Sequence, residues 1–316
     1  MDEAQLAVRS AVRTASADRP DRVLVACSGG PDSIALLDAT LWVGERDGFE
    51  VSCCIVDHGL QPDSEVIATE VANVARALGC DDVHVVRVEV RADGDGLEAA
   101  ARDARRAALR ECAKALGADA IYLGHTREDQ AETVLMRLAR GSGARSLSAM
   151  AARDGTWRRP FLELPRATVH AAAAGLATWT DPMNLDPAFT RSRVRTELLP
   201  VLTKVLGPGA VLGLARSAEL ARADADALDA IAGEVPVQPG EPLDVAVLLA
   251  LPMAVRTRVI RRWLAAPIEF EHLRSVERLV SAWHGQGPVS LPRGVKVGRD
   301  CERLVVTIEE RQPRGR

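Results

Sequence analysis

Two glycines flanked by serines and an aspartate form the part of this chain best suited to hold a phosphate group. The segment Ser28-Gly29-Gly30-Pro31-Asp32-Ser33 follows a short apolar run at residues 23–27 and precedes helical apolar spacing at 34–43. Backbone N–H groups and the helix dipole attract anions at such a turn. Because the Asp32 carboxylate would repel bare phosphates, the segment predicts a phosphate bound together with Mg²⁺. No Gly-Lys-Ser/Thr follows, so a Walker A loop is excluded; an ordinary tight turn is the structural alternative.

Two further polar clusters come directly after apolar runs. Asp57 and His58 follow the run at 51–56, and His125 follows the run at 120–123. His125, Asp129 and Glu132 have the spacing i, i+4 and i+7, so in a helix they share one face and suit Mg²⁺ and a polar substrate. Helix caps and salt bridges without metal are the alternative for these residues.

The elements that must position these clusters alternate between strand and helix. Four strand-then-helix units over residues 23–135 predict an α/β fold with a doubly wound, mostly parallel, Rossmann-like sheet. Ligands collect beyond the carboxyl ends of the strands in such sheets, where the three clusters fall. Beyond residue 140, helical patterns at 194–205, 209–232 and 245–283 precede short strands at 289–308. We therefore expect a domain at 1–205 and a smaller helical C-terminal domain at 206–316 that ends in a short β unit.

Composition indicates a soluble protein with a substantial core. The 316 residues are 47% hydrophobic and 27% charged, which excludes extended disorder. The sequence has no run of 18 uncharged apolar residues and no secretory signal, so we expect a cytoplasmic protein without a membrane span. Six cysteines without a C-x-x-C pair argue against a disulfide framework or a zinc ribbon.

The basic residues are unevenly distributed although the net charge is −4. Only three of the 40 basic residues are lysines, and arginines are in excess between Arg137 and Arg166 and again between Pro187 and Lys204. Such runs are usually solvated faces, but they also suit phosphate contacts. The charge pattern alone leaves both interpretations open.

Taken together, the motifs resemble those of the tRNA(Ile)-lysidine synthetase family in the N-type ATP pyrophosphatase superfamily. The hexapeptide at 28–33 is similar to the pyrophosphate-binding loop, and residues 56–60 are similar to the V-D-H-G-L segment. Residues 124–133 are similar to G-H-H-x-D-D-Q-x-E-T, with Thr126 and Glu128 departing from the pattern. Further likeness lies in a helix at 97–106, in R-x-x-R-G-S-G at 137–143 and in an arginine-rich segment at 181–195. The resemblance spans about residues 23–202 and continues more weakly into the C-terminal third.

The resemblance implies a ligase that forms a carbon–nitrogen bond. ATP would adenylate the carbonyl oxygen of the wobble cytidine in the isoleucine tRNA with a CAU anticodon, and pyrophosphate would leave. The ε-amine of free L-lysine would then attack the activated carbon and release AMP, so that the tRNA reads AUA. ATP and Mg²⁺ are the implied cofactors, and a homodimer is a candidate assembly.

The resemblance also implies a role for each site residue. Catalysis falls to Asp32, His125, Asp129 and Glu132, and Mg²⁺ to Asp32 and Asp129. ATP binding falls to Ser28, Gly29, Gly30, Pro31, Asp32, Ser33, Asp57 and His58. Substrate or tRNA contacts fall to Arg105, Arg137, Arg140, Arg191, Arg193 and Arg195. The C-terminal third is expected to bind tRNA through its most basic helix, which carries Arg256, Arg258, Arg261 and Arg262.

Two other functions remain open from sequence. A tRNA thiolase could share the same core, but sulfur transfer needs paired catalytic cysteines or a cysteine-bound iron–sulfur cluster. This chain offers only the adjacent Cys53 and Cys54, in an expected strand. A non-catalytic nucleotide- or RNA-binding module could keep the loop at 28–33, but it would not need Asp32, Asp129 and Glu132 together.

Overall fold

The chain forms two compact units. The computed structural model describes residues 2–59, 63–90, 97–141, 143–179, 181, 186–266 and 268–308, with only the backbone described at 97 and 98. The units are Met1–Leu220 and Ala221–Arg316, divided within helix α10 (Ala210–Gly233). The functional division expected after residue 205 stays a prediction.

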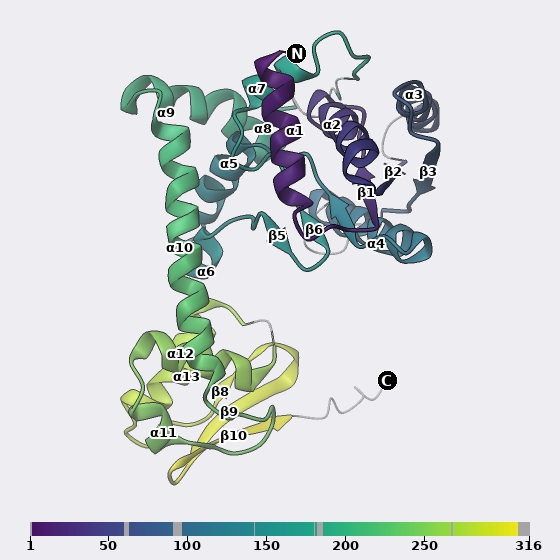
Figure 1. Ribbon diagram of the computed structural model, residues 1–316. Coiled ribbons are helices and arrows are strands. Elements are labelled where there is room, and N and C mark those ends of the chain that lie inside the picture. The colour runs from purple at the N-terminus through teal and green to yellow at the C-terminus, as the bar shows by residue number, and fades with distance from the viewer. Residues whose placement is uncertain are drawn as a thin grey trace, which may run out of the picture. The chain divides into compact units, whose positions relative to one another are not determined.

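A six-stranded sheet organises the first unit (Figure 1). Its order is β3-β2-β1-β4-β6-β5, parallel throughout except for the antiparallel edge strand β5. The strands are β1 (Arg22–Ala26), β2 (Glu50–Asp57), β3 (Asp82–Arg87), β4 (Ala120–Tyr122), β5 (Arg153–Asp154) and β6 (Trp157–Arg158). This confirms the predicted mostly parallel α/β sheet; the short pair β5 and β6 was not expected from sequence.

Strand β1 is the point at which the order of the sheet reverses. Strands β2 and β3 lie on one side of it, and β4 and β6 lie on the other. The segments that leave β1 and β4 therefore face a common crevice at the carboxyl ends of these strands, which is where doubly wound sheets bind ligands. The hexapeptide at 28–33 and His125 both follow strands at this edge.

Helices cover both faces of the sheet, as a doubly wound fold requires: α1, α2, α3 and α7 pack on one face and α4 on the other. The helices of this unit are α1 (Glu3–Ala15), α2 (Pro31–Asp47), α3 (Ser64–Ala77), α4 (Leu97–Leu116), α5 (Arg127–Leu138), α6 (Ala144–Leu147), α7 (Arg166–Ala172), α8 (Thr190–Arg193) and α9 (Leu199–Leu206). A π-helical turn, Val194–Leu198, joins α8 to α9. Helix α1, which packs against α2 and α7, was missed from sequence.

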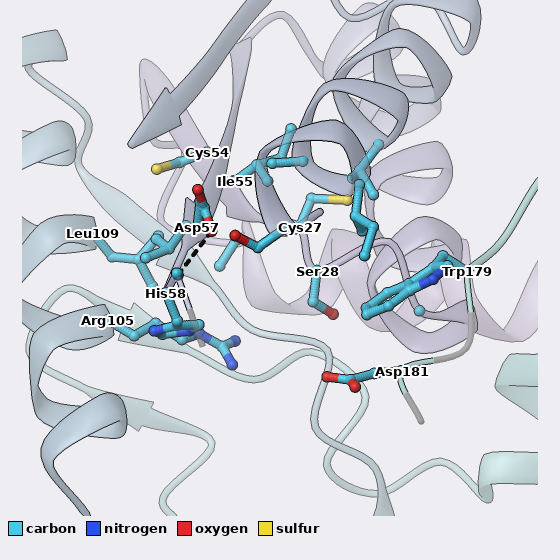
Figure 2. A pocket seen from close by; sticks show the side chains of 18 residues that line it. Cys27, Ser28, Cys54, Ile55, Asp57, His58, Arg105, Leu109, Trp179 and Asp181 are labelled. Carbon is cyan, nitrogen blue, oxygen red and sulfur yellow. Dashed lines mark hydrogen bonds between the residues drawn. The ribbon is translucent and has the colours of Figure 1, made fainter. Parts of the chain in front are cut away.

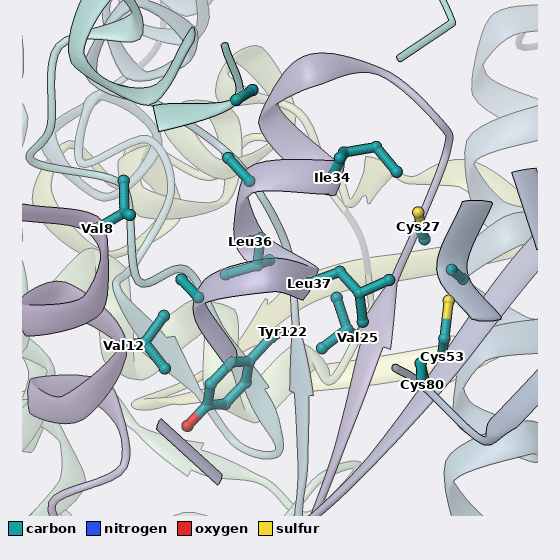
Figure 3. Close-up of a cluster of buried hydrophobic side chains, with 14 of the residues drawn as sticks. Val8, Val12, Val25, Cys27, Ile34, Leu36, Leu37, Cys53, Cys80 and Tyr122 are labelled. Carbon is teal, nitrogen blue, oxygen red and sulfur yellow. The ribbon is translucent and has the colours of Figure 1, made fainter. Parts of the chain in front are cut away.

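Alternating side chains of β1 enter two different cores, because successive residues of a strand point to opposite faces. Val23 and Val25 pack with α1, α2, α3 and α7, whereas Leu24 and Ala26 pack with α4. Figure 3 shows Val25 close to Leu37 in the first core. Burial on both faces explains why the sequence of β1 is continuously apolar rather than alternating.

The second unit has its own core and a four-stranded antiparallel sheet of order β7-β10-β9-β8. Its elements are β7 (Leu243–Asp244), α11 (Val245–Leu249), α12 (Met253–Leu264), α13 (Phe270–Ser281), β8 (Val289–Ser290), β9 (Val295–Asp300) and β10 (Arg303–Ile308). The fully buried Trp263 belongs to this core. The predicted helices followed by a short β unit are thus confirmed.

The arginines of α12 are engaged within the second unit. Arg256 pairs with Glu277 at 2.9 Å, and Arg258 pairs with Asp229 at 2.6 Å. Arg261 donates to the carbonyl of Ile268, and Arg262 donates to the carbonyl of Ala232. The expectation that this helix binds tRNA stays a prediction, and these contacts show that each of its four arginines also has a partner within the unit.

Among the described residues, no single helix has the length and apolar character needed to cross a membrane. The bent pair Thr190–Leu206 and Ala210–Gly233 meets those two criteria only when its members are taken together.

Candidate functional site

The turn after β1 is built so that its backbone can approach a ligand. Gly29 has a φ of +83°, and a Cβ there would lie 2.5 Å from Cγ2 of Val71, so a side chain is excluded for two reasons. Ser33 Oγ accepts a hydrogen bond from the backbone N–H of Ser28 at 3.1 Å and donates to the carbonyl of Gly30 at 2.9 Å. Gly30 caps α2, and Pro31 is its first residue. The turn is thereby held open at a helix N-terminus, as anion binding requires.

A cavity of about 250 Å³ opens beside this turn (Figure 2). Apolar side chains from β1, β2, α3 and α4 form much of its wall, and a few polar groups converge on it. The lining comprises Ala26, Cys27, Ser28, Gly30, Cys54, Ile55, Val56, Asp57, His58, Gly59, Ser64, Ile67, Ala68, Val71, Arg105, Leu109, Trp179 and Asp181. No lysine lies among them. An apolar slot with few polar groups is typical of a small-molecule site.

Asp57, His58 and Arg105 bring polar groups to this cavity. Oδ1 of Asp57 accepts the backbone N–H of Gly59 at 2.9 Å, which fixes the turn after β2. Burial lowers the pKa of His58, and nearby Arg105 lowers it further. Burial also lowers the pKa of Arg105, which makes no ion pair within the described part of the chain. An unpaired cation on the wall of a cavity suits an anionic ligand.

Gly124 joins the two sequence motifs. A Cβ at this position would lie 2.9 Å from the carbonyl oxygen of Asp32 and 3.3 Å from the backbone nitrogen of Ser33. The end of β4 therefore touches the first turn of α2 directly. This contact brings the residues after Gly124 to the phosphate-binding turn.

His125 lies outside the helix that carries Asp129 and Glu132. Helix α5 begins at Arg127, with Thr126 as its N-cap, so the predicted common helical face is wrong for His125. The reason is that Thr126 takes the capping position: its backbone N–H and hydroxyl both donate to Oδ2 of Asp129 at 2.8 Å. Burial lowers the pKa of His125 to about 3, so its imidazole is neutral near pH 7.

Three arginines enclose the carboxylates of Asp129 and Glu132, both of which are buried. Oδ1 of Asp129 lies 3.0 to 3.1 Å from all three guanidinium groups. The carboxylate of Glu132 lies 3.2 Å from Arg166, 2.9 Å from Arg191 and 2.7 Å from Arg195. The three are Arg166 at the start of α7, Arg191 on α8 and Arg195 in the π-helical turn.

This cluster sets the pKa values of two acidic groups in opposite directions. Burial alone would raise the pKa of Asp129, but Arg166 and Arg191 outweigh it and hold that pKa well below its ordinary value. Burial, together with the neighbouring charge of Asp129, raises the pKa of Asp32. Asp32 also lies 3.2 Å from Nε2 of His170. The two carboxyl groups thus lie close enough to interact but have different environments.

Asp32 fits a Mg²⁺ ligand better than Asp129 does. Oδ1 of Asp32 is buried and accepts no hydrogen bond within the described chain, and the side chain that pairs with it there is the His170 imidazole at 3.2 Å, so its lone pairs are open to a cation. Both oxygens of Asp129 are already engaged. The described residues contain no group of three His, Cys, Asp or Glu side chains arranged to hold a metal. Mg²⁺ commonly uses one or two carboxylates plus substrate phosphates, which Asp32 alone would satisfy.

Other predicted arginines lie elsewhere. Arg137 donates to the carbonyls of Ser146 and Ala149 at 2.6 and 3.1 Å, and so braces the segment after α5. Arg140 and Arg193 are exposed. Arg191 and Arg195 turn to the carboxylates, whereas Arg193 lies near Thr190. Leu60, Ser142 and residues 182–185 of the quoted motifs lie outside the described residues.

Several site residues were missed from sequence. Arg166 and His170 stand on α7, and Trp179 and Asp181 line the cavity. No local pattern marks α7, apart from Pro165 at its cap. Glu128, one of the two departures from the family motif, accepts the backbone N–H of Arg166 at 2.7 Å and so fixes the start of that helix. Only the long-range contacts show that these residues belong to the site.

Comparisons with known proteins cover both units. A PP-loop domain family matches residues 4–202, and a TilS substrate binding domain family matches residues 243–305. A tRNA(Ile)-lysidine synthase from Thermobifida fusca is 54% identical over 312 residues, covering 95% of this chain and 96% of that protein. One from Streptomyces coelicolor is 49% identical over 298 residues, covering 90% and 84%.

A solved structure shares the fold. The U34-tRNA thiolase NcsA from Methanococcus maripaludis, with its [4Fe-4S] cluster, superposes with a TM-score of 0.55 at 17% identity. The match covers 70% of this chain and 79% of that one. At this identity the likeness concerns the fold alone.

Proposed function

Because the chain belongs to the tRNA(Ile)-lysidine synthase family, we propose that it joins free L-lysine to the wobble cytidine of the isoleucine tRNA with a CAU anticodon, at the expense of ATP. The reaction forms a carbon–nitrogen bond and releases AMP and pyrophosphate. The observation that carries the proposal is the backbone contact between Gly124 and Asp32, because it sets a nucleotide-sized cavity beside a carboxylate–arginine cluster. A thiolase is not favoured, since its likeness to this chain extends only to the fold.

ATP is the substrate assigned to the cavity and the turn after β1. The adenosine occupies the apolar slot near His58, and the phosphates lie along Ser28 to Ser33 at the N-terminus of α2. Arg105 supplies a positive charge on the wall of the cavity. This pose directs the α-phosphorus towards Asp32 and the strand end at Gly124.

The first step transfers the adenylyl group of ATP to the nucleobase. The carbonyl oxygen of cytosine forms a bond to the α-phosphorus, and the bond to the β-phosphate oxygen breaks, with pyrophosphate leaving. Asp32 and the phosphates would hold Mg²⁺, which would neutralise the charge that develops on the leaving pyrophosphate. The neutral imidazole of His125 is available as a hydrogen-bond partner for the base.

The second step uses the amine of lysine. The ammonium first releases a proton to solvent, because only the neutral amine has a lone pair; its nitrogen then forms a bond to the activated carbon, the carbon–oxygen bond breaks, and AMP leaves with that oxygen. Asp129 and Glu132 are the groups that hold the incoming ammonium. Asp129 is suited to binding the cation rather than to taking its proton, because its pKa is held below the ordinary value.

Recognition of the whole tRNA is assigned to the second unit, by its match to a substrate binding domain family. Arg140 and Arg193 remain proposed tRNA contacts of the first unit, since both are exposed. Arg137 is proposed to act indirectly, through the carbonyls that it braces. Cytoplasmic location and a homodimer stay predictions.

Mass spectrometry of the wobble nucleoside tests this function. The purified protein is incubated with a CAU-anticodon tRNA transcript, ATP and L-lysine. We expect the nucleoside to gain the mass of lysine less one water, and omission of lysine or ATP to prevent the gain. Addition of sulfur from a supplied donor, or an unchanged nucleoside under all conditions, would overturn the proposal.

A further inference from the structure

We propose that Arg191 and Arg195 mask the carboxylates of Asp129 and Glu132 until ATP binds, so that the nucleotide must enter the site before the amine. The inference rests on the proposed function, which brings a triphosphate and an ammonium group to neighbouring places. It concerns the order of binding, which the reaction itself does not dictate.

The two carboxylates leave no oxygen free for an ammonium group. Oδ2 of Asp129 accepts two hydrogen bonds from Thr126, and Oδ1 accepts one from each of the three arginines. Oε1 and Oε2 of Glu132 accept two each, from the same three arginines. An incoming amine would therefore have to displace a guanidinium group to reach either carboxylate.

The charge of the cluster also opposes a lone cation. Within the ion pairs themselves, three guanidinium groups face two carboxylates, an excess of one positive charge that the neighbouring Asp32 offsets in part. A second ammonium group would add to that excess, whereas an anion would relieve it. The resting arrangement thus favours phosphate over lysine.

Two of the three arginines are placed to follow the phosphates. Burial alone would lower the pKa of Arg195, but the hydrogen bond and charge of Glu132 raise it, and the charges of Asp129 and of Asp32 at the phosphate-binding turn add to the rise. Burial lowers the pKa of Arg105, which lines the nucleotide cavity, and the neighbouring positive charge of Arg191 lowers it further. Both side chains are about 30% exposed, whereas Arg166 is 17% exposed.

Arg166 is held in place from its own backbone. Its N–H donates to Oε2 of Glu128 at 2.7 Å, while its guanidinium group bridges Asp129 and Glu132 through a single nitrogen. Phosphate accepts guanidinium donors in pairs and carries more charge than a carboxylate. A bound triphosphate would thus draw Arg191 and Arg195 away and leave Arg166 to hold the carboxylates in position for lysine.

The consequence is a positive coupling between nucleotide and lysine. In the wild-type protein without tRNA, we expect lysine to bind about ten-fold more tightly in the presence of an ATP analogue with a methylene group between the α- and β-phosphates. Because coupling is reciprocal, lysine must tighten binding of that analogue by the same factor. Isothermal titration calorimetry measures both. Equal lysine affinity with and without the analogue would overturn the inference.

Replacement of one masking arginine provides a second test, because it should uncover the carboxylates for lysine even when no nucleotide is bound. We expect Arg195→Met to bind lysine more tightly than the wild type when no nucleotide is present, by about three-fold or more, and to show a smaller coupling factor. If Arg195 only stabilised the site, its replacement would weaken the binding of lysine instead. Arg193→Met, in the same segment but exposed, is the matched control and should keep the wild-type coupling. If Arg195→Met does not fold, the reciprocal titrations on the wild type still decide the question.

Failure of this inference is distinguishable from failure of the proposed function. Lysidine formation in tRNA together with uncoupled binding of lysine and nucleotide would reject the masking and leave the reaction intact. Absence of lysidine formation would reject the reaction itself, whatever the coupling.

Discussion

The backbone of Gly124, at the end of β4, lies against the backbone of Asp32, in the first turn of α2, with no room between them for a side chain. Two motifs that are far apart in the sequence therefore meet through main-chain atoms. Their spacing does not depend on any flexible group, so the relative position of nucleotide and carboxylates is set by the sheet.

Gly124→Ala should impair catalysis more than folding. The added Cβ must push against backbone, with an expected destabilisation of about 1–3 kcal/mol, and a shift of less than 1 Å at the site can lower the rate by as much as about 100-fold. Urea unfolding and single-turnover AMP release measure the two effects. Gly213→Ala, where a Cβ meets nothing within 4 Å, is the control and should be neutral or stabilising. Full activity of Gly124→Ala would show that the contact is not needed.

Glu132→Gln should destabilise the first unit. The substitution leaves three guanidinium groups with one carboxylate, and breaking a buried ion pair costs about 3–5 kcal/mol. We expect a smaller cost, about 1–3 kcal/mol, because the arginines are partly exposed. Urea denaturation gives the value, and the exposed Glu163→Gln should lie within about 0.5 kcal/mol of the wild type. A wild-type midpoint for Glu132→Gln would mean that the cluster adds nothing to stability.

His125 should make stability depend on pH. Its folded pKa, about 3, is below the ordinary 6.5, so between these values the unfolded chain binds the extra proton. Its contribution is therefore complete above pH 6.5 and is lost progressively as the pH falls towards 3, with a slope of at most about 1.4 kcal/mol per pH unit. Urea unfolding of the wild type and His125→Gln from pH 7 to 4.5 should show a shallower slope in the variant. His284→Gln, at an exposed position, should keep the wild-type slope, and parallel slopes for all three proteins would contradict the assignment.

Arg105→Met should weaken the binding of ATP without lowering the stability of the protein. We expect the dissociation constant for ATP to rise about ten-fold or more, because a charge-assisted contact is worth about 1.5–3 kcal/mol. Stability should stay level or increase, since a partly buried cation without an ion pair is removed. Trp179, which lines the cavity, offers a fluorescence signal for the titration. The control is Arg110→Met on the same helix, which is exposed; unchanged ATP affinity in Arg105→Met would remove this residue from the site.

Arg256→Met should lower the stability of the second unit, and a compensating change should restore it. The partner, Glu277, would be left buried without its cation, at a cost of about 3 kcal/mol. The double variant Arg256→Met with Glu277→Met removes both charges and should regain most of the loss. Differential scanning calorimetry measures the thermal unfolding of the second unit. A single variant as stable as the wild type would indicate that the pair is not coupled.

Sequence predicts this fold well where local pattern decides the structure. The apolar run at 23–27 predicts a buried strand, because few other conformations bury so many consecutive residues. The glycines that follow predict a turn, because Gly29 can adopt the positive φ found there. The same holds for the helix expected at 97–106, which forms the first part of α4. Short elements such as β5 and β6 contain too few residues to show the alternation of apolar and polar side chains that identifies a strand.

The carboxylate–arginine cluster could be predicted only in part. Asp129 and Glu132 stand in a recognisable motif, but their partners Arg166 and Arg195 come from separate elements, and no local spacing reveals that pairing. The sequence likewise does not show that Arg256 is paired within its own unit. Charge counts identify cations but not their partners, which depend on the tertiary fold.

The absence of lysine from the described lining of the nucleotide cavity has a chemical consequence if the proposed reaction holds. An adenylated cytosine is an electrophile prepared for capture by a primary amine, and an enzyme that makes one risks labelling itself. The sequence has three lysines, Lys114, Lys204 and Lys296, and none of them is among the described residues of the cavity wall. The ε-amine of a lysine side chain of the enzyme therefore does not compete with free lysine for the activated base. Arginine keeps the positive charge that phosphates need while remaining protonated and therefore non-nucleophilic.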